Sequence, residues 1–363
     1  MIKDSDRIKV EFSHLTDFRD ITAEEWNMLY ALASDIYEHP ADYAGVCSGK
    51  LLGTLFYEPS TRTQLSFQAA MIRLGGNVIG FSDPARSSVS KGESLVDTIR
   101  IISGYCDLLA MRTAVEGSAL AASYYSSVPV INAGDGGHLH PTQTLTDLFT
   151  ITRLKGTLTG LCIGICGDLL NGRTVHSLAG ALSRYHGNTI YLISTGELKI
   201  PMWCQKLLIS SGNRIIETQS LEECIPRLDV LYMTRIQKER FNSESEYIAQ
   251  SKVYRLDEDK LYFAKKDLLI MHPLPKVDEI VPAVDDDPRA GYFDQARFGM
   301  YVRMALIISL CEKPFVKKPS PRAFTGTRKC TNPKCVTAFE HYLQPFMRRD
   351  GDEIRCVYCD KKI

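Results

Sequence analysis

Short apolar runs of strand length alternate along the chain with longer amphipathic segments. Seven runs have the length and composition of buried strands: "LLGTLFY", "LLAMR", "VPVINA", "LCIGICGD", "TIYLIS", "VLYMTR" and "LLIMHPLP". The segments between them, such as "SFQAAMIRLGG" and "TVHSLAGALSRY", have helical periodicity. Alternation of this kind predicts an α/β protein with doubly wound parallel sheets flanked by helices.

The apolar runs fall into two groups, before and after about residue 145, which predicts two α/β domains over residues 1–145 and 146–295. "HPTQTLTDLFTITRLKG", with Pro141 near its first turn, is the expected connecting helix. "FGMYVRMALIISLCE" is the expected last helix, over residues 296–311. Residues 312–327 are rich in Pro and Lys and predict a linker. Residues 328–363 form a third, smaller segment.

The composition is that of a globular protein: 363 residues, 44% hydrophobic and 24% charged. No apolar run reaches the roughly 18 residues of a membrane span, and the polar N-terminus does not resemble a signal peptide. We therefore expect a cytoplasmic protein. The net charge of zero hides an asymmetry, because residues 313–363 hold 12 Lys and Arg against 5 Asp and Glu, and residues 1–312 hold 31 against 38. An acidic body thus carries a tail of net charge +7.

Four of the 11 cysteines are clustered near the C-terminus, where Cys330 and Cys335 form one close pair and Cys356 and Cys359 another. Two short-spaced pairs separated by 20 residues are typical of a tetrahedral, four-thiolate zinc site. Two disulfides are the alternative, which a cytoplasmic location disfavours. The sequence therefore predicts a structural zinc ion in a small zinc-ribbon-like β domain, which has too little core to fold unaided.

The stretch "EPSTRTQ", residues 58–64, joins the first apolar run to the helical segment that follows it. A helix N-terminus has unpaired backbone N–H groups and a partial positive charge, so it favours anions. Ser60, Thr61 and Thr63 add hydroxyl donors there, and Arg62 adds a guanidinium group suited to phosphate. One serine or threonine would suffice as an N-cap. Three hydroxyl residues and an arginine in a row therefore predict an anion site.

Other predicted strand ends carry matching side chains, at the edge of the sheet where open α/β sheets bind ligands. These candidates are Arg112, His140, Gln143, Arg173, Arg235 and Gln237. Together with Arg62 they provide four arginines and a histidine, which predicts strongly anionic substrates, although each arginine alone is also consistent with a surface ion pair. The chain has no Walker loop and no glycine-rich dinucleotide fingerprint after its first predicted strand, which disfavours a nucleotide.

Five motifs together resemble those of aspartate transcarbamoylase (aspartate carbamoyltransferase) catalytic chains: "STRT", "HPTQTLTDLFTI", "GDLLNGRTVHSL", "VLYMTRIQKER" and "HPLPKVDEI". They occur in the family's order and cover roughly residues 8 to 310. The resemblance implies that residues 1–145 bind carbamoyl phosphate, that residues 146–295 bind aspartate, and that helix 296–311 completes the first domain. It also implies a homo-oligomer built on trimers whose active sites are shared between neighbouring chains.

The resemblance further implies the reaction, in which the carbamoyl group of carbamoyl phosphate passes to the α-amine of L-aspartate. The products are N-carbamoyl-L-aspartate, used in de novo pyrimidine biosynthesis, and phosphate. The implied ligands of carbamoyl phosphate are Ser60, Thr61, Arg62, Thr63, Arg112, His140, Gln143, and the backbone carbonyls of Leu274 and Pro275. The implied ligands of aspartate are Lys91, Arg173, Arg235 and Gln237.

Four of these residues are implied to be catalytic: Arg62, Arg112, His140 and Lys91. Fixed donors would stabilise the negative charge that grows on the carbamoyl oxygen, so no metal or cofactor is expected in catalysis. Lys91 and either Ser87 or Ser88, in "SSVSKGE", would reach into a neighbour's site.

The nearest alternative is an ornithine transcarbamoylase. Ornithine presents an amine where aspartate presents a second carboxylate, so an ornithine site should offer acidic side chains. This chain has Arg235 and Gln237 at that place, reads "HPLP" where ornithine enzymes typically read "HCLP", and lacks their "SMG" motif. These differences favour aspartate.

Residues 328–363 resemble the zinc domain of the separate regulatory chain that accompanies some aspartate transcarbamoylases. That chain's nucleotide-binding domain has no counterpart here, which predicts a fused docking module without direct control by CTP or ATP. The charge of +7 over residues 313–363 favours contact with the acidic body. A nucleic-acid-binding zinc ribbon is the alternative from another class, but "TAFEHYLQPFMRRDGDEI" has no base-reading pattern. We therefore expect no nucleic-acid or membrane partner.

Overall fold

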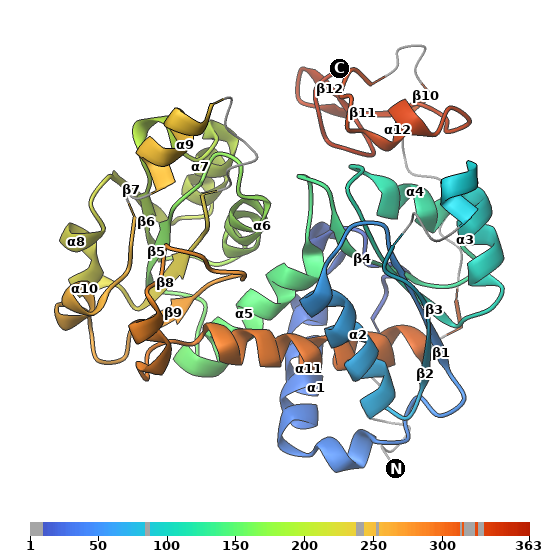
Figure 1. Ribbon diagram of the computed structural model, residues 1–363, viewed down its shortest axis with the longest axis horizontal. Coiled ribbons are helices and arrows are strands. Elements are labelled where there is room, and N and C mark those ends of the chain that lie inside the picture. The colour runs from blue at the N-terminus through green and yellow to red at the C-terminus, as the bar shows by residue number, and fades with distance from the viewer. Residues whose placement is uncertain are drawn as a thin grey trace. The chain divides into compact units, whose positions relative to one another are not determined.

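The computed structural model describes residues 10–83, 88–236, 243–251, 254–312, 314–315, 324–325 and 330–363. The chain divides into two compact units, one formed by Met1–Thr142 with Gly299–Ile363 and the other by Gln143–Phe298. Figure 1 labels the helices and strands of both. The described helices include none with the length and apolarity needed to cross a lipid bilayer.

A four-stranded parallel sheet lies at the centre of the first unit, in the order β2-β1-β3-β4. Its strands are β1 (Leu51–Phe56), β2 (Asn77–Phe81), β3 (Leu108–Thr113) and β4 (Val130–Asp135). The inner strands are almost fully buried, as expected where helices cover both faces of a parallel sheet.

Helices α2, α3 and α4 connect these strands, and α1 precedes them. Thr22 and Glu25 form a capping box at the start of α1, which explains where that helix begins. The helices of this unit are α1 (Ala23–Glu38), α2 (Thr61–Arg73), α3 (Leu95–Ser103), α4 (Ser118–Tyr125), the part of α11 (Tyr292–Cys311) from Gly299 onward, and the 3-10 helices η2 (Phe18–Asp20), η3 (Pro40–Tyr43) and η5 (Ser88–Lys91).

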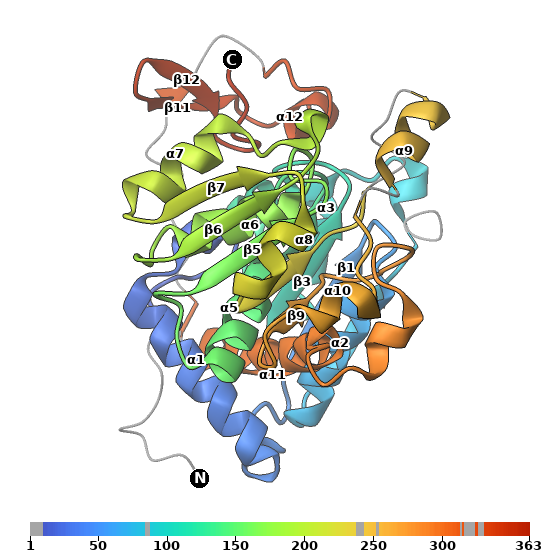
Figure 2. The same ribbon diagram turned by 90° about the vertical axis from the view of Figure 1, so that its left-hand side faces the viewer.

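The second unit contains a five-stranded parallel sheet in the order β7-β6-β5-β8-β9. Figure 2 shows β7, β6 and β5 side by side. The strands are β5 (Cys162–Cys166), β6 (Thr189–Ile193), β7 (Arg214–Thr218), β8 (Val230–Met233) and β9 (Leu269–Met271). The helices are α5 (Pro141–Lys155, from Gln143 onward), α6 (Arg173–Leu182), α7 (Met202–Ser210), α8 (Leu221–Cys224), α9 (Glu244–Ser251), α10 (Glu258–Tyr262), the first part of α11, and the 3-10 helices η6 (Gly196–Leu198), η7 (Ile225–Arg227) and η9 (Pro282–Asp286).

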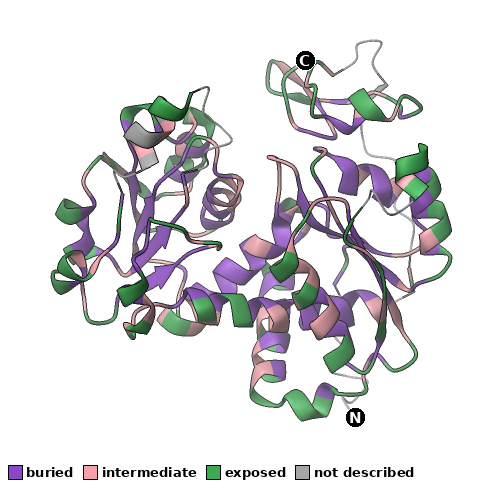
Figure 3. Ribbon diagram, in the orientation of Figure 1, coloured by how far each residue is buried: buried purple, intermediate pink, exposed green. Residues whose placement is uncertain are grey.

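Residues 330–363 form a small antiparallel module within the first unit, which we call the metal-binding domain. It contains α12 (Val336–Phe339), β11 (Phe346–Asp350) and β12 (Glu353–Cys356), and β10 (Phe324–Thr325) pairs with β11. Val336, Leu343 and Tyr358 of this domain share a buried cluster with Ala119 and Ala122 of α4. Figure 3 shows buried residues in α4 and in the metal-binding domain.

The predicted fold class is confirmed: two α/β units with parallel sheets and a small C-terminal β region. All seven apolar runs coincide with strands of the two sheets. Two strands escaped prediction, β2 and β7, and both are partly exposed along their length. Each lies at the edge of its sheet, where polar residues are tolerated and the apolar signal is weak.

Candidate active site and metal centre

In each sheet some of the predicted polar residues stand at the ends of the two strands between which the winding direction reverses. β2 lies on one side of β1 while β3 and β4 lie on the other, and β5 likewise separates β6 and β7 from β8 and β9. Such a reversal leaves room for a ligand outside the carboxyl ends of the two central strands. Ser60 and Arg112 stand at these ends in the first unit, and Arg173 and Arg235 stand at them in the second.

The polar corner after β1 begins α2. Ser60 is the N-cap residue, yet its side chain makes no capping hydrogen bond, so simple capping does not explain this serine. Thr61 and Arg62 are exposed in the first turn, and Thr63 is half-buried. The first turn of α2 contains no acidic residue, so the helix does not neutralise its own positive end. The uncapped helix start and its hydroxyl and guanidinium donors therefore agree with the predicted anion site.

Arg112, near the end of β3, connects this corner to the segment after β4. Its Nη2 donates to Glu58 Oε1 at 2.7 Å, and its Nη1 lies 3.3 Å from His140 Nε2. Its Nε is buried and has no acceptor among the described residues. Desolvation and, secondly, the charge of Arg112 lower the pKa of Arg62. Two guanidinium groups that repel each other beside a buried, unsatisfied donor favour the binding of an anion.

The second unit places two of the predicted aspartate ligands after its central strands. Arg173 is the first residue of α6, and Arg235 follows the end of β8. Arg235 lines a hollow together with Thr234, Ile236, Tyr247, Tyr254, Val277, Asp278 and Glu279. Gln237 lies outside the described residues.

The "HPLP" segment belongs to a closed loop, residues 272–279, in the second unit. His272 Nδ1 accepts a hydrogen bond from the Leu274 N–H at 2.8 Å, and His272 Nε2 lies 2.8 Å from Glu279 Oε1. Leu274 has a left-handed φ of 53°, and its peptide bond to Pro275 is cis. No residue that the structure describes donates a hydrogen bond to the carbonyl of Leu274 or Pro275, so both carbonyls are available as acceptors.

The loop that is predicted to reach into a neighbouring chain's active site lies only partly within the described residues. Lys91 ends η5 and is exposed, as is Ser88 at the start of the same turn. Ser87 lies outside the described residues, so the choice between the two serines stays a prediction. Gln143 lies in the first turn of α5, where its Nε2 donates to Asp147 Oδ1 at 2.7 Å.

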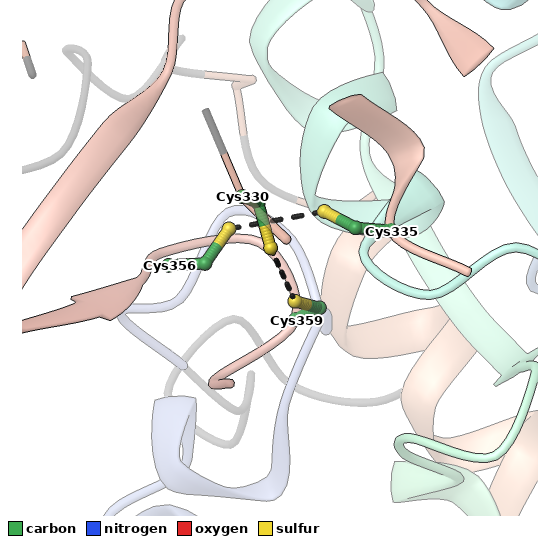
Figure 4. Close-up of side chains that lie close together, drawn as sticks. All are labelled: Cys330, Cys335, Cys356 and Cys359. Atoms are coloured by element: carbon green, nitrogen blue, oxygen red, sulfur yellow. Dashed lines mark hydrogen bonds between the residues drawn. The ribbon is translucent and has the colours of Figure 1, made fainter. Parts of the chain in front are cut away.

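The four clustered cysteines converge in the metal-binding domain (Figure 4). Their sulfur atoms all lie within 4.8 Å of one another, with Cys330 and Cys359 3.5 Å apart and Cys335 and Cys356 3.8 Å apart. Thiolates about 2.3 Å from a tetrahedral zinc ion are about 3.8 Å from each other, so this donor set fits zinc. No disulfide joins the four thiols. The contact between Cys335 and Cys356 lowers the pKa of the Cys335 thiol and raises that of the Cys356 thiol, because one sulfur donates its proton to the other.

Comparison with known families assigns all three parts of the chain. Residues 13–153 match the family described as "Aspartate/ornithine carbamoyltransferase, carbamoyl-P binding domain", and residues 159–310 match its "Asp/Orn binding domain". The chain belongs to the aspartate/ornithine carbamoyltransferase family. Residues 323–363 match the "Aspartate carbamoyltransferase regulatory chain, metal binding domain", which confirms the predicted fusion of a catalytic chain to a regulatory-chain domain.

Curated relatives show that the chain belongs to the aspartate, and not the ornithine, type within this family. The aspartate carbamoyltransferase catalytic subunit of Clostridium novyi is 58% identical over 294 residues, covering 81% of this chain and 96% of the relative. That of Clostridium botulinum (strain Eklund 17B) is 56% identical over 302 residues, covering 83% and 98%. The predicted transferase activity of the aspartate carbamoyltransferase type is thereby confirmed.

Solved structures of aspartate transcarbamoylases are also similar to this chain. The catalytic subunit of M. jannaschii aspartate transcarbamoylase has a TM-score of 0.78 and 46% identity, covering 83% of this chain and 98% of its own. The Trypanosoma cruzi enzyme, solved in complex with carbamoyl phosphate and aspartate, has a TM-score of 0.77 and 37% identity, covering 84% and 98%.

Two carboxylates that the sequence reasoning did not single out are central to this carbamoyltransferase scaffold. Glu58 pairs with Arg112, with Arg112 Nη2 2.7 Å from Glu58 Oε1. Asp147, in α5, accepts hydrogen bonds from Gln143, from Tyr232 at 3.0 Å and from Gln295 at 2.6 Å. Glu58 stands in the polar corner itself, so its position was a usable signal. Asp147 had none, because Tyr232 and Gln295 come from the distant elements β8 and α11.

Proposed function

We propose that this aspartate carbamoyltransferase binds carbamoyl phosphate mainly through its first unit and L-aspartate through its second. The domain assignment is residues 1–145 with helix 296–311 for carbamoyl phosphate, residues 146–295 for aspartate, residues 312–327 as linker and residues 328–363 for zinc. The observation that carries the proposal is the grouping of Arg62, Arg112 and His140 at the reversal point of the first sheet.

The proposed ligands are those expected from the sequence. Carbamoyl phosphate is bound by Ser60, Thr61, Arg62, Thr63, Arg112, His140, Gln143 and the carbonyls of Leu274 and Pro275. Aspartate is bound by Arg173, Arg235, Gln237 and Lys91. Lys91 acts from a neighbouring chain, together with Ser87 or Ser88. The aligned structures of the Trypanosoma cruzi enzyme with both substrates support this substrate pair.

The proposed mechanism is direct attack of the aspartate α-amine on the carbamoyl carbon. A C–N bond forms while the C–O bond to phosphate breaks, and the departing phosphate takes the proton that the amine loses. Negative charge grows on the carbamoyl oxygen, and Arg62, Arg112 and His140 donate to it. The two anionic substrates repel each other, so much of the remaining rate comes from holding them together. The chain needs no covalent nucleophile for this reaction.

We propose that the metal is one structural zinc ion, held by Cys330, Cys335, Cys356 and Cys359. The four-sulfur donor set and its spacing support zinc over oxygen-preferring cations. Bound zinc would contribute folding free energy to a domain with a small apolar core.

We also propose trimers with shared active sites as the catalytic assembly, and N-carbamoyl-L-aspartate for pyrimidine synthesis as the product. The test is to assay carbamoyl transfer from carbamoyl phosphate to L-aspartate and to L-ornithine with the same purified protein. We expect N-carbamoyl-L-aspartate and stoichiometric phosphate, with little product from ornithine. Preference for ornithine would contradict the proposed aspartate ligands.

A further inference from the structure

The start of α3 is built partly from the metal-binding domain. The N-cap residue Ser94 accepts the Asp97 N–H at 3.1 Å, as an ordinary cap does. The next two backbone amides donate to side chains of the metal-binding domain. The Leu95 N–H donates to Glu340 Oε1 at 3.0 Å, and the Val96 N–H donates to the Tyr342 hydroxyl oxygen at 3.1 Å. These two residues lie about 245 positions further along the chain.

Glu340 and Tyr342 act as one acceptor group. The Tyr342 hydroxyl donates to Glu340 Oε2, which leaves Oε1 for Leu95 and a hydroxyl lone pair for Val96. The Tyr342 ring lies edge-on to Tyr125 of α4, with ring centroids 6.5 Å apart. A carboxylate at a helix N-terminus meets both the unpaired N–H groups and the positive end of the helix dipole. Hydrogen bonds to the start of α3, as well as the ring contact with Tyr125, therefore fix the position of Glu340 and Tyr342.

The residues just before this helix start carry Lys91. Its turn is closed by hydrogen bonds from the Gly92 N–H to the Val89 carbonyl at 3.0 Å and from the Glu93 N–H to the Ser88 carbonyl at 3.3 Å. Ser94 follows at once, and Leu95 and Val96 are buried while Lys91 is exposed. Because so short a stretch of chain separates Lys91 from Leu95, fixing the first turn of α3 also limits where the Lys91 backbone can lie.

We propose that Glu340 and Tyr342 are positioning residues for carbamoyl transfer. By capping α3, the metal-binding domain holds the Lys91 turn in the place from which its ammonium group reaches aspartate. The inference rests on the proposed role of Lys91 in binding aspartate. It gives the fused domain a part in the aspartate site of the enzyme, in addition to any part in assembly.

The test uses the full zinc-loaded protein with Glu340→Gln and Tyr342→Phe, each of which removes one acceptor while keeping the side-chain shape. We expect the KM for aspartate to rise about three- to tenfold, on the scale of a lost helix cap or charged hydrogen bond, with a smaller change in kcat. Amide hydrogen exchange of residues 88–98 should become faster. Zinc content should not change. Glu353→Gln is the matched control, because Glu353 bonds to Arg355 and Lys362 within its own domain.

A second comparison asks whether the effect runs through Lys91. In a Lys91→Ala background, whose small residual activity is measured at high enzyme concentration, Glu340→Gln should no longer change the KM for aspartate, since the side chain that it positions is gone. An equal fold-change in both backgrounds would mean a general structural effect and would overturn the proposal. A normal KM in Glu340→Gln and Tyr342→Phe would overturn it too. A normal KM in Lys91→Ala alone would instead refute the role of Lys91, and the inference with it.

Discussion

Gly117, at the N-cap of α4, lies directly against Tyr358 of the metal-binding domain: a Cβ added at Gly117 would lie 2.6 Å from the Tyr358 Cβ and 2.7 Å from its carbonyl oxygen. Next to it, Glu116 Oε2 accepts a hydrogen bond from Asn332 Nδ2 at 2.7 Å, and the Glu116 N–H donates to the Lys334 carbonyl at 2.8 Å. The turn before α4 is therefore shaped for this domain.

Gly117→Ala should weaken the seating of the metal-binding domain. Gly117 has a φ of 85°, and the added methyl group would also clash with Tyr358. We expect a loss of about 2 to 4 kcal/mol in the free energy of unfolding from strain and overpacking together. Gly49→Ala is the control, because Gly49 has a φ of 78° and nothing within 4 Å of its added Cβ. Urea unfolding measures both, and equal losses would show that the contact with Tyr358 contributes nothing.

Arg62→Ala should reduce kcat for carbamoyl transfer by at least about a hundredfold, roughly 3 kcal/mol of transition-state stabilisation, because it removes a charged donor from the growing oxyanion. Arg73→Ala, in the last turn of the same helix, is the matched control and should keep near-normal rates. Steady-state kinetics with both substrates decides the matter. Similar rates for the two variants would remove the anion-site argument.

Mixing Lys91→Ala chains with Arg62→Ala chains should restore part of the activity if active sites are shared. Each variant alone should be nearly inactive. A mixed oligomer can pair an intact Arg62 of one chain with an intact Lys91 of another. Activity is measured after dissociation and reassembly, with subunit exchange confirmed by mass. Absence of recovery in confirmed hybrids would argue for sites built within single chains.

Removing the metal should loosen the metal-binding domain without abolishing the chemistry. We expect one zinc ion per chain by elemental analysis, and none after Cys356→Ser with Cys359→Ser. The variant should have faster amide exchange in residues 330–363 and a smaller or less stable oligomer, because metal binding supplies folding free energy there. Residual transfer should persist with a raised KM for aspartate. Native protein without zinc, or an unchanged assembly in the variant, would count against this role.

The loop 272–279 should lose stability in acid through Glu279. Burial alone would raise the pKa of Glu279, but a hydrogen bond from His272, together with backbone N–H groups, lowers it below its ordinary value of 4.5. The stabilisation is therefore present above about pH 4.5 and is lost as the pH falls through the lowered folded-state pKa. Glu279→Gln should flatten the acid side of the stability profile, measured by urea unfolding between neutral and acidic pH. Glu223→Gln, on an exposed glutamate, should leave the profile unchanged.

Local patterns in the sequence were enough to predict seven strands of the two parallel sheets, the polar corner and the cysteine cluster. The inner strands are apolar because both of their faces are buried. Each therefore appears in the sequence as an uninterrupted apolar run, which a few residues are enough to identify. The thiol pairs are close in sequence because a metal needs donors from two tight turns. The cluster of four sulfur atoms in the structure agrees with that spacing.

Long-range pairing was decided only by the tertiary structure. Glu58 meets Arg112 because β1 and β3 are neighbours in the sheet, which is a property of strand order and not of either segment alone. The capping of α3 by Glu340 and Tyr342 likewise depends on where the metal-binding domain packs. A helix N-terminus accepts any suitable acceptor within reach, so its own sequence does not specify the partner. The sequence by itself thus determined which chemical groups are present, and the packing of distant segments determined which of them meet.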